Sequence, residues 1–129
     1  MTPNYDISQD DHNITWVVLH EPHSLDDLIE VVADVADNYP NRLRLYDMRK
    51  FTFNLSSEDV QAISEFGKIK FKNPGRIALL VKDKLSFGIM RIFEAHRSQA
   101  GIARIRVFWE DAEAINWLRQ EAKDMDATD

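Results

Sequence analysis

The side chains best suited to bind a ligand or a partner gather between residues 47 and 57. A strand pattern ends there on a carboxylate, a basic and aromatic loop follows, and a pair of serines opens the next helix. In open sheets with helical crossovers, ligands are met at the carboxyl ends of the strands, and the free amides of a helix N-terminus favour anions. We therefore predict a partner- or ligand-binding site that contains Asp47, Arg49, Phe51, Phe53, Ser56 and Ser57.

These residues also have structural explanations, which the sequence leaves open. Asp47 suits a turn or a helix cap as well as a ligand-facing role. Ser56 can cap the helix, because Asp59 three residues later completes a capping-box pattern. Either Ser56 or Ser57 could instead accept a phosphate, which would meet the helix dipole and the exposed amides. The aromatic loop residues either fold over the end of the sheet or line a groove for a hydrophobic ligand.

The sequence contains none of the common catalytic motifs. It has no cysteine, which excludes disulfides, thiolate metal sites and a cysteine nucleophile. It has no G-x-S-x-G turn, and its four glycines form neither G-x-G-x-x-G nor a Walker loop. His20, Glu21 and His23 could contact a metal, but they lie at a strand end and outside the H-E-x-x-H pattern, so we expect surface histidines. The sequence thus predicts a protein that is not an enzyme and that holds no cofactor or metal.

The charges are divided unevenly along a chain whose net charge is -6. Residues 1–67 carry 4 basic and 13 acidic side chains, whereas residues 68–106 carry 10 basic and 2 acidic ones. The overall acidity argues against nucleic-acid binding, which needs clustered cations. The basic stretch represents either solvated lysines or a patch for an anionic ligand, a lipid head group or an acidic partner. Because no apolar run is long enough to span a membrane and the start is polar, we expect a cytoplasmic protein without a transmembrane segment.

Strands and helices alternate along most of the chain. Strands are predicted at 5–9, 14–20, 42–48, 77–81 and 103–109, and helices after Ser24, near Ser56, at 85–100 and from Asp111. The first two strands are expected to form an antiparallel hairpin, and the unbroken apolar strand 77–81 to lie at the centre of the sheet. The order β-β-α-β-α-β-α-β-α predicts an α/β fold with a mixed, mostly parallel sheet and helices packed on it. We expect one domain over residues 1–129, with a disordered tail at about 123–129.

Several segments resemble the SpoIIAA-like proteins, small bacterial domains with the STAS fold. The likeness covers about residues 5–120 and is carried by the strand 43–47, the helix opening 55–60, the strand 76–81, Phe87-Gly88 and the segment 106–118, which includes the closing A-x-x-W-L signature at 114–118. The resemblance implies a sheet of four or five strands and a non-enzymatic, regulatory role in partner switching. By that resemblance Asp47 matches the acid that ends the family's third strand, and Ser56 or Ser57 lies near its phosphorylated serine. This chain departs from the family in having a longer loop there and no glycine.

Two functions follow from these observations. The first is a binding module that docks a protein partner, either another protein or a second copy of this chain, through residues 47–57 and the following helix. The second is a carrier or sensor of a small amphipathic or anionic ligand, a lipid or a nucleotide, with Phe51, Phe53 and Phe87 as an apolar wall and basic side chains as the counter-charge. The family resemblance includes relatives linked to nucleotide or lipid binding, and its fold is similar to that of Sec14-type lipid carriers.

Overall fold

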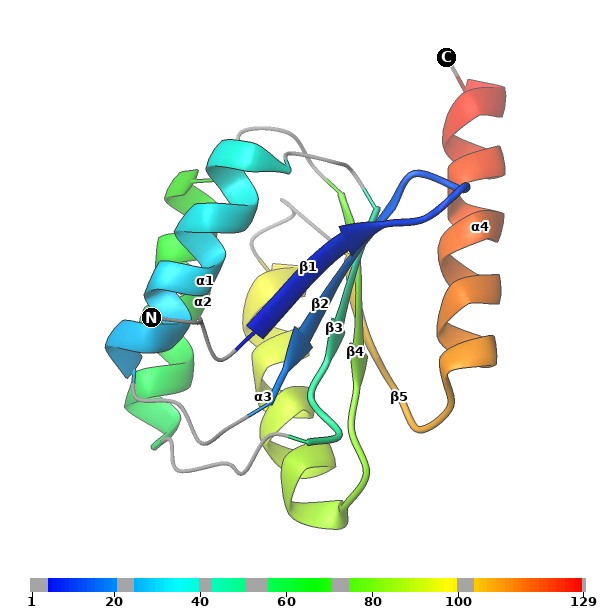
Figure 1. Cartoon of the computed structure of the whole chain (residues 1–129). Helices are drawn as coiled ribbons and strands as arrows, with labels where there is room; N and C mark the ends of the chain where they lie inside the picture. The colour runs from blue at the N-terminus through cyan, green and yellow to red at the C-terminus, as the bar shows by residue number, and fades with distance from the viewer. Residues whose placement is uncertain are drawn as a thin grey trace.

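The computed structural model describes residues 5–20, 25–39, 43–50, 56–70, 75–99 and 104–128, and only the backbone of residues 57, 68, 96–99 and 121–128. The described residues form five strands and four helices in the predicted order (Figure 1). The elements are β1 (Tyr5–Gln9), β2 (Ile14–Leu19), α1 (Leu25–Asn38), β3 (Leu43–Asp47), α2 (Ser57–Lys70), β4 (Arg76–Leu80), α3 (Lys84–Gln99), β5 (Arg104–Phe108) and α4 (Asp111–Thr128). The predicted α/β fold is confirmed.

The five strands form one sheet in the order β1-β2-β3-β4-β5. The strands β2 to β5 run parallel to one another, and β1 pairs with β2 in antiparallel fashion, as the sequence predicted. The hairpin closes through a turn in which Asn13 donates to the carbonyl of Asp10 and takes a positive φ of 61°. Asparagine tolerates this left-handed conformation better than most residues, which explains a turn here without glycine.

The helices cover the two faces of the sheet unequally. Figure 1 shows α1, α2 and α3 on one face and α4 alone on the other. Parallel strands that are neighbours in both sequence and space need a crossover helix, and crossovers are nearly always right-handed. Three successive crossovers in the same direction therefore place their helices on the same face. The chain changes face only after β5.

Each face of the sheet has its own apolar core. On the three-helix face, Val17, Leu79 and Val107 of the sheet pack with residues of α1 that include Val31 and Val35. On the α4 face, the core is formed by Ile14, Leu45, Ala78, Leu80, Phe108, Ala114 and Leu118. The strand β4 is confirmed as buried on both faces, since Ile77 to Val81 are all buried. This burial on both sides explains its unbroken apolar sequence. It lies between β3 and β5, next to the edge strand β5, and the middle strand of the sheet is β3.

Two further features concern the end of the chain and a buried arginine. The backbone of α4 continues to Thr128, and the disordered tail at about 123–129 stays a prediction. That segment contains neither glycine nor proline, the two residues that most disfavour a helix. Arg44, which alternates with leucines in the sequence, is only 1% exposed on the three-helix face. In the described part of the chain, no helix is long and apolar enough to cross a membrane.

The packing of β4 gives a direct test of the core. Leu80 is fully buried and belongs to the core under α4. Replacing it by alanine removes buried apolar surface and leaves a cavity, so Leu80→Ala should lower the free energy of unfolding by ~2–5 kcal/mol. Urea denaturation followed by circular dichroism measures this change. An unchanged midpoint would contradict the placement of Leu80 in the core.

Candidate functional site

The carboxyl ends of the central strands lie level with one another. The Met48 amide donates to the Leu80 carbonyl over 2.9 Å, and the Val81 amide donates to the Phe108 carbonyl over 3.1 Å, so the ladder continues just past the strands. In Figure 1 the helices α2, α3 and α4 all begin at this edge. The structure thus brings the end of β3 and the start of α2 to a common edge, where the sequence predicted a site.

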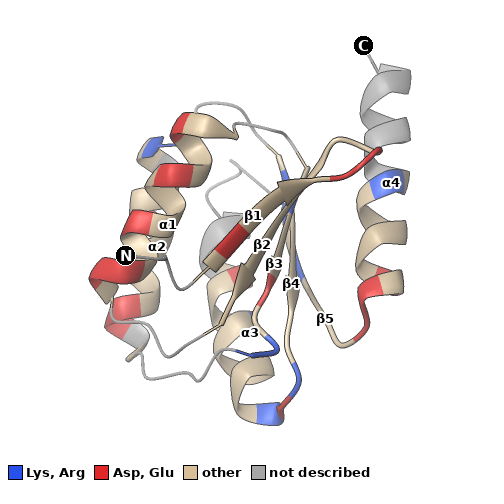
Figure 2. Ribbon diagram, viewed as in Figure 1, with Lys and Arg blue, Asp and Glu red and all other residues tan. Residues whose placement is uncertain are grey.

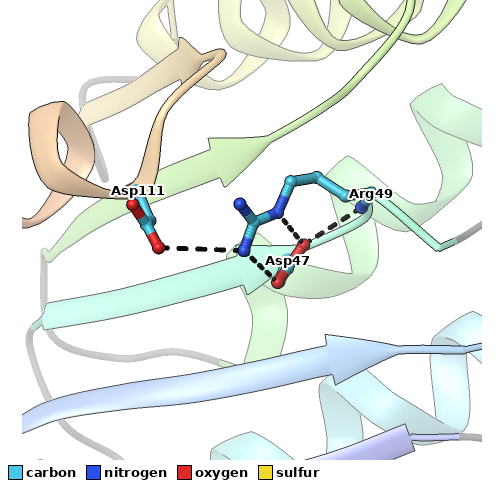
Figure 3. Close-up of polar contacts among 3 residues, drawn as sticks. All are labelled: Asp47, Arg49 and Asp111. Atoms are coloured by element: carbon cyan, nitrogen blue, oxygen red, sulfur yellow. Dashed lines mark hydrogen bonds and ion pairs between the residues drawn. The ribbon is translucent and has the colours of Figure 1, made fainter.

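Asp47 and Arg49 form a closed ion pair at the end of β3 (Figure 3). The carboxylate oxygen Oδ1 of Asp47 accepts hydrogen bonds from the backbone N–H of Arg49 at 3.0 Å and from its Nε at 2.9 Å. The other oxygen, Oδ2, accepts from Nη2 of Arg49 at 2.8 Å. The planar guanidinium matches the carboxylate with two parallel bonds, and the backbone bond fixes the turn after the strand. The two side chains therefore hold each other in one geometry.

The pair keeps Asp47 ionised. Asp47 is only 8% exposed, and this burial alone would raise the pKa of its carboxyl. The hydrogen bonds from the side chain and backbone of Arg49, together with its positive charge, outweigh the burial and hold the pKa below its usual value. The pKa of Arg49 shifts in the opposite direction, because the hydrogen bond to Asp47 raises it. The Asp47 carboxylate is thus an anion across the physiological range.

Arg49 also links the end of β3 to the start of α4. Its Nη2 lies 3.9 Å from Oδ2 of Asp111, the first residue of α4 (Figure 3). Asp47 lies on the α4 face of the sheet, because Leu43, Leu45 and Asp47 are every second residue of β3 and the two leucines pack in the core under α4. One guanidinium therefore contacts two carboxylates from segments far apart in the sequence. Arg49 and Asp111 are both partly exposed, so this cluster reaches the surface.

Ser56 is the N-cap of α2. Its hydroxyl oxygen accepts a hydrogen bond from the Asp59 amide, and the Asp59 carboxylate accepts one from the Ser56 amide, each at 3.1 Å. This reciprocal pair confirms the capping box predicted from the sequence. The side chain of Ser57 lies outside the described residues, and so do Phe51 and Phe53. Their predicted roles in binding, or in accepting a phosphate, stay predictions.

The connections after β4 and β5 leave the same edge toward opposite faces of the sheet. The first leads into α3, whose start is capped by Asp83 Oδ1 accepting from the Ser86 amide at 2.7 Å. The second leads across to α4 (Figure 1). The Phe87 ring of α3 stacks on Trp109, the residue after β5, with ring centroids 4.7 Å apart and planes 6° from parallel. Phe87, predicted as part of a ligand wall, therefore holds α3 against the end of β5.

Of the histidine motif, the structure describes His20 alone. His20 Nε2 lies 2.6 Å from the Asp6 carboxylate of the neighbouring strand, while residues 21–24 lie outside the described ranges. No group of three or more metal-ligating side chains comes together among the described residues.

Sequence reasoning named Asp47 and Arg49 as candidates but missed their mutual pairing and the contribution of Asp111. A partial signal was present, because an arginine two residues after a strand-ending acid can fold back on it. The approach of Asp111 depends on how α4 packs on β3, which no local pattern reveals.

The ion pair predicts a pH-dependent effect of removing Arg49. Arg49→Ala leaves a mostly buried carboxylate without its bidentate partner, which should cost ~1–3 kcal/mol at neutral pH. Because the pKa of Asp47 is lowered in the folded state, its contribution to stability is present above the ordinary value of 3.8 and is lost as the pH falls below it. The difference between wild type and variant should therefore narrow below about pH 4.

Urea denaturation at a series of pH values measures this difference. Arg91→Ala is the matched control, because Arg91 pairs with Glu94 on the surface of α3. Its loss should change the free energy of unfolding little at any pH. A difference that stays constant down to pH 3 would contradict the assigned ion pair.

The capping box predicts a smaller effect at Ser56. Ser56→Ala removes the oxygen that accepts the Asp59 amide, and should lower stability by ~1 kcal/mol. Ser56→Asn keeps an uncharged acceptor at the same position and should restore most of the loss. Equal stability of the alanine variant and the wild type in urea titrations would show that the cap does not contribute.

Comparison with known proteins does not assign the chain to a family. Neither the models of known protein families nor the curated protein sequences match it. The resemblance to SpoIIAA-like proteins thus rests on the motifs and element order of the sequence itself and stays a prediction. Function has to be argued from the geometry of the site.

Proposed function

We propose that this protein is a non-enzymatic binding module that docks a protein partner through the carboxyl edge of its sheet. The binding surface is formed by the cluster of Asp47, Arg49 and Asp111, which we call the edge cluster, together with Lys50 and the Ser56 start of α2. The observation that carries the proposal is the edge cluster, in which one arginine is held by two carboxylates. A regulatory role in partner switching is implied by the resemblance to STAS domains, and so is a bacterial source. The cytoplasmic location is inferred from the sequence.

The edge cluster suits docking because its charges are already arranged. Arg49 and Asp111 are partly exposed, while Lys50, which follows Arg49, and Ser56, at the start of α2, are exposed. A partner that meets side chains fixed in their bound geometry loses less conformational entropy than one that must order flexible ones. Charges of both signs at defined positions also favour one partner orientation over others.

The electrostatics of Asp47 support binding over acid–base catalysis. A general acid or base works best with a pKa near the working pH, which for a carboxyl requires a raised value. Burial would raise the pKa of Asp47, but the hydrogen bonds and the charge of Arg49 outweigh this effect and lower it. Its carboxylate is also engaged on both oxygens by Arg49.

Phosphorylation at the start of α2 would act against this geometry. The Ser56 hydroxyl oxygen and the Asp59 carboxylate are each engaged with the other residue's backbone amide. A phosphate on Ser56 would place a second negative group beside Asp59, and this repulsion would oppose the gain from the helix dipole. Such a modification would therefore disturb the capped start of α2, which is the kind of change that could release a docked partner.

Site-specific photo-crosslinking in the cells that express the protein tests the proposal. A benzophenone amino acid replaces Lys50, which is exposed beside the edge cluster, and in a control chain it replaces Gln120, which is exposed on α4. We expect a defined protein adduct from position 50 that is absent from position 120. Arg49→Gln, with its fold verified by circular dichroism, should reduce the yield of that adduct severalfold. The same adducts from both positions, or an unchanged yield with the folded variant, would refute docking at this edge.

A further inference from the structure

The strand β1 forms an open edge of the sheet, far from the edge cluster in sequence. Among the described residues, β1 pairs with β2 alone and ends the strand order. In an antiparallel pair, successive residues point their backbone groups alternately toward the partner and away from it. The backbone amide of Asp10 donates to the carbonyl of Ile14 across the hairpin. By the same alternation, the backbone groups of Ser8 and Asp6 also point toward β2. The backbone N–H and C=O groups of Tyr5, Ile7 and Gln9 therefore point outward.

A groove runs between this edge and α1. It has a volume of about 450 Å³ and is lined by Tyr5, Asp6, Ile7, Asp34, Asn38 and Tyr39. One wall is the strand β1 and the other is the last part of α1, so the groove combines unpaired strand groups with a helix side. Such a combination accepts an extended peptide, which adds a strand to the sheet while its side chains enter the groove.

The polar groups of the groove are fixed and negative. The Tyr5 hydroxyl donates to Asp34 Oδ2 at 2.7 Å, and Asn38 Nδ2 donates to Asp34 Oδ1 at 2.6 Å. Burial, the hydrogen bond to Asp34, and the negative charges of Asp34 and Glu30 raise the pKa of Tyr5 to about 12. Asp6, with a side chain 76% exposed, adds a further carboxylate on the other side of the strand.

No basic side chain belongs to the elements that form this groove. The first 41 residues contain no lysine and no arginine, and Figure 2 shows acidic segments along α1 and on β1. The groove thus repels anions such as nucleotides, phospholipid head groups and nucleic acids. It favours a ligand that carries positive charge.

The same charge argues against a second copy of this chain. If β1 paired antiparallel with β1 of another copy, the two-fold symmetry would bring both α1 helices to the same face of the joined sheet. The Glu30 and Asp34 side chains of each copy would then flank a shared strand pair, and like charges so placed repel. A basic segment meets the opposite condition at the same positions.

We propose that the groove between β1 and α1 binds an extended, basic peptide segment of a partner protein by strand addition to β1. The backbone of the segment pairs with the outward groups of Tyr5, Ile7 and Gln9. Its alternate side chains lie under α1, where lysine or arginine meets Asp34 and Glu30 and an apolar stem packs on Ile7. This surface is separate from the edge cluster and does not depend on its function.

The test uses a fluorescein-labelled peptide of alternating lysine and valine, with an alternating glutamate and valine peptide as the probe of opposite charge. Fluorescence anisotropy with the full chain measures affinity, and amide NMR shifts locate the site. We expect saturable binding of the basic peptide alone, with shifts centred on β1 and the last part of α1. Glu30→Gln combined with Asp34→Asn should weaken binding about fivefold or more, because two negative charges are lost while the size and shape of the side chains are kept.

Two further variants separate charge and strand addition from general effects. Asp26→Asn combined with Glu113→Gln removes the same number of charges from exposed positions outside the groove and should leave the affinity unchanged. Ile7→Pro removes one outward N–H without touching the bonds to β2, a change that edge strands tolerate, and should abolish binding in a chain that still folds. Its fold is checked by NMR, and the charge variants carry the test if it fails to fold.

Several outcomes would overturn the proposal. These are the absence of saturable binding, equal binding of both peptides, or shifts that map outside β1 and α1. Sedimentation of the free protein adds another, because a dimer that Ile7→Pro dissociates would mean that the edge is occupied by a second copy instead.

Discussion

The parallel order of β2 to β5 is the constraint on which the rest of the molecule depends. Since each of these strands lies beside its sequence neighbour, every passage from strand to helix occurs at one edge of the sheet. Three crossovers load one face with α1, α2 and α3, and α4 alone covers the other (Figure 1). Arg49 lies at this edge of the sheet, between the end of β3 and the start of α4. By binding Asp47 at the end of β3 and approaching Asp111 at the start of α4, it joins the sheet edge to the helix of the opposite face.

Charge is arranged by element as well as by sequence. The acidic first third of the chain folds into β1, β2 and α1, at one side of the sheet. Its first 41 residues contain no lysine or arginine, and Lys70 of α2 lies 3.9 Å from Asp37. The edge cluster behaves differently, because Arg49 lies two residues from the acid that it binds. A carboxylate paired within its own loop contributes little field at a distance, whereas the acids along α1, an element without lysine or arginine, act together. The two proposed surfaces would therefore select partners by different means, geometry at one and net charge at the other.

The sequence predicted the elements well because each has a local signal. Ser56 and Asp59 marked the start of α2 through a bond that spans only three residues, and the apolar run of β4 marked a strand buried on both faces. Prediction failed where the deciding contact was distant. The burial of Arg44 depends on the helices that cover its face of the sheet, and the groove on the approach of Asp34 to Tyr5, residues 29 positions apart.

The register of the sheet bears on whether the two surfaces act together. Asp6 pairs with Val18, and Val18 pairs with Asp47, so the open edge and the edge cluster belong to one cross-strand row. Two strand spacings separate them, roughly 10 Å. Such proximity does not itself couple two sites, because coupling needs an element with two arrangements that both sites bias. The row consists of hydrogen-bonded strands with a buried core beneath, and Asp47 is held by Arg49 on both oxygens. A segment added to β1 would therefore extend a rigid sheet rather than move its opposite side, and loss of one surface should leave the other intact.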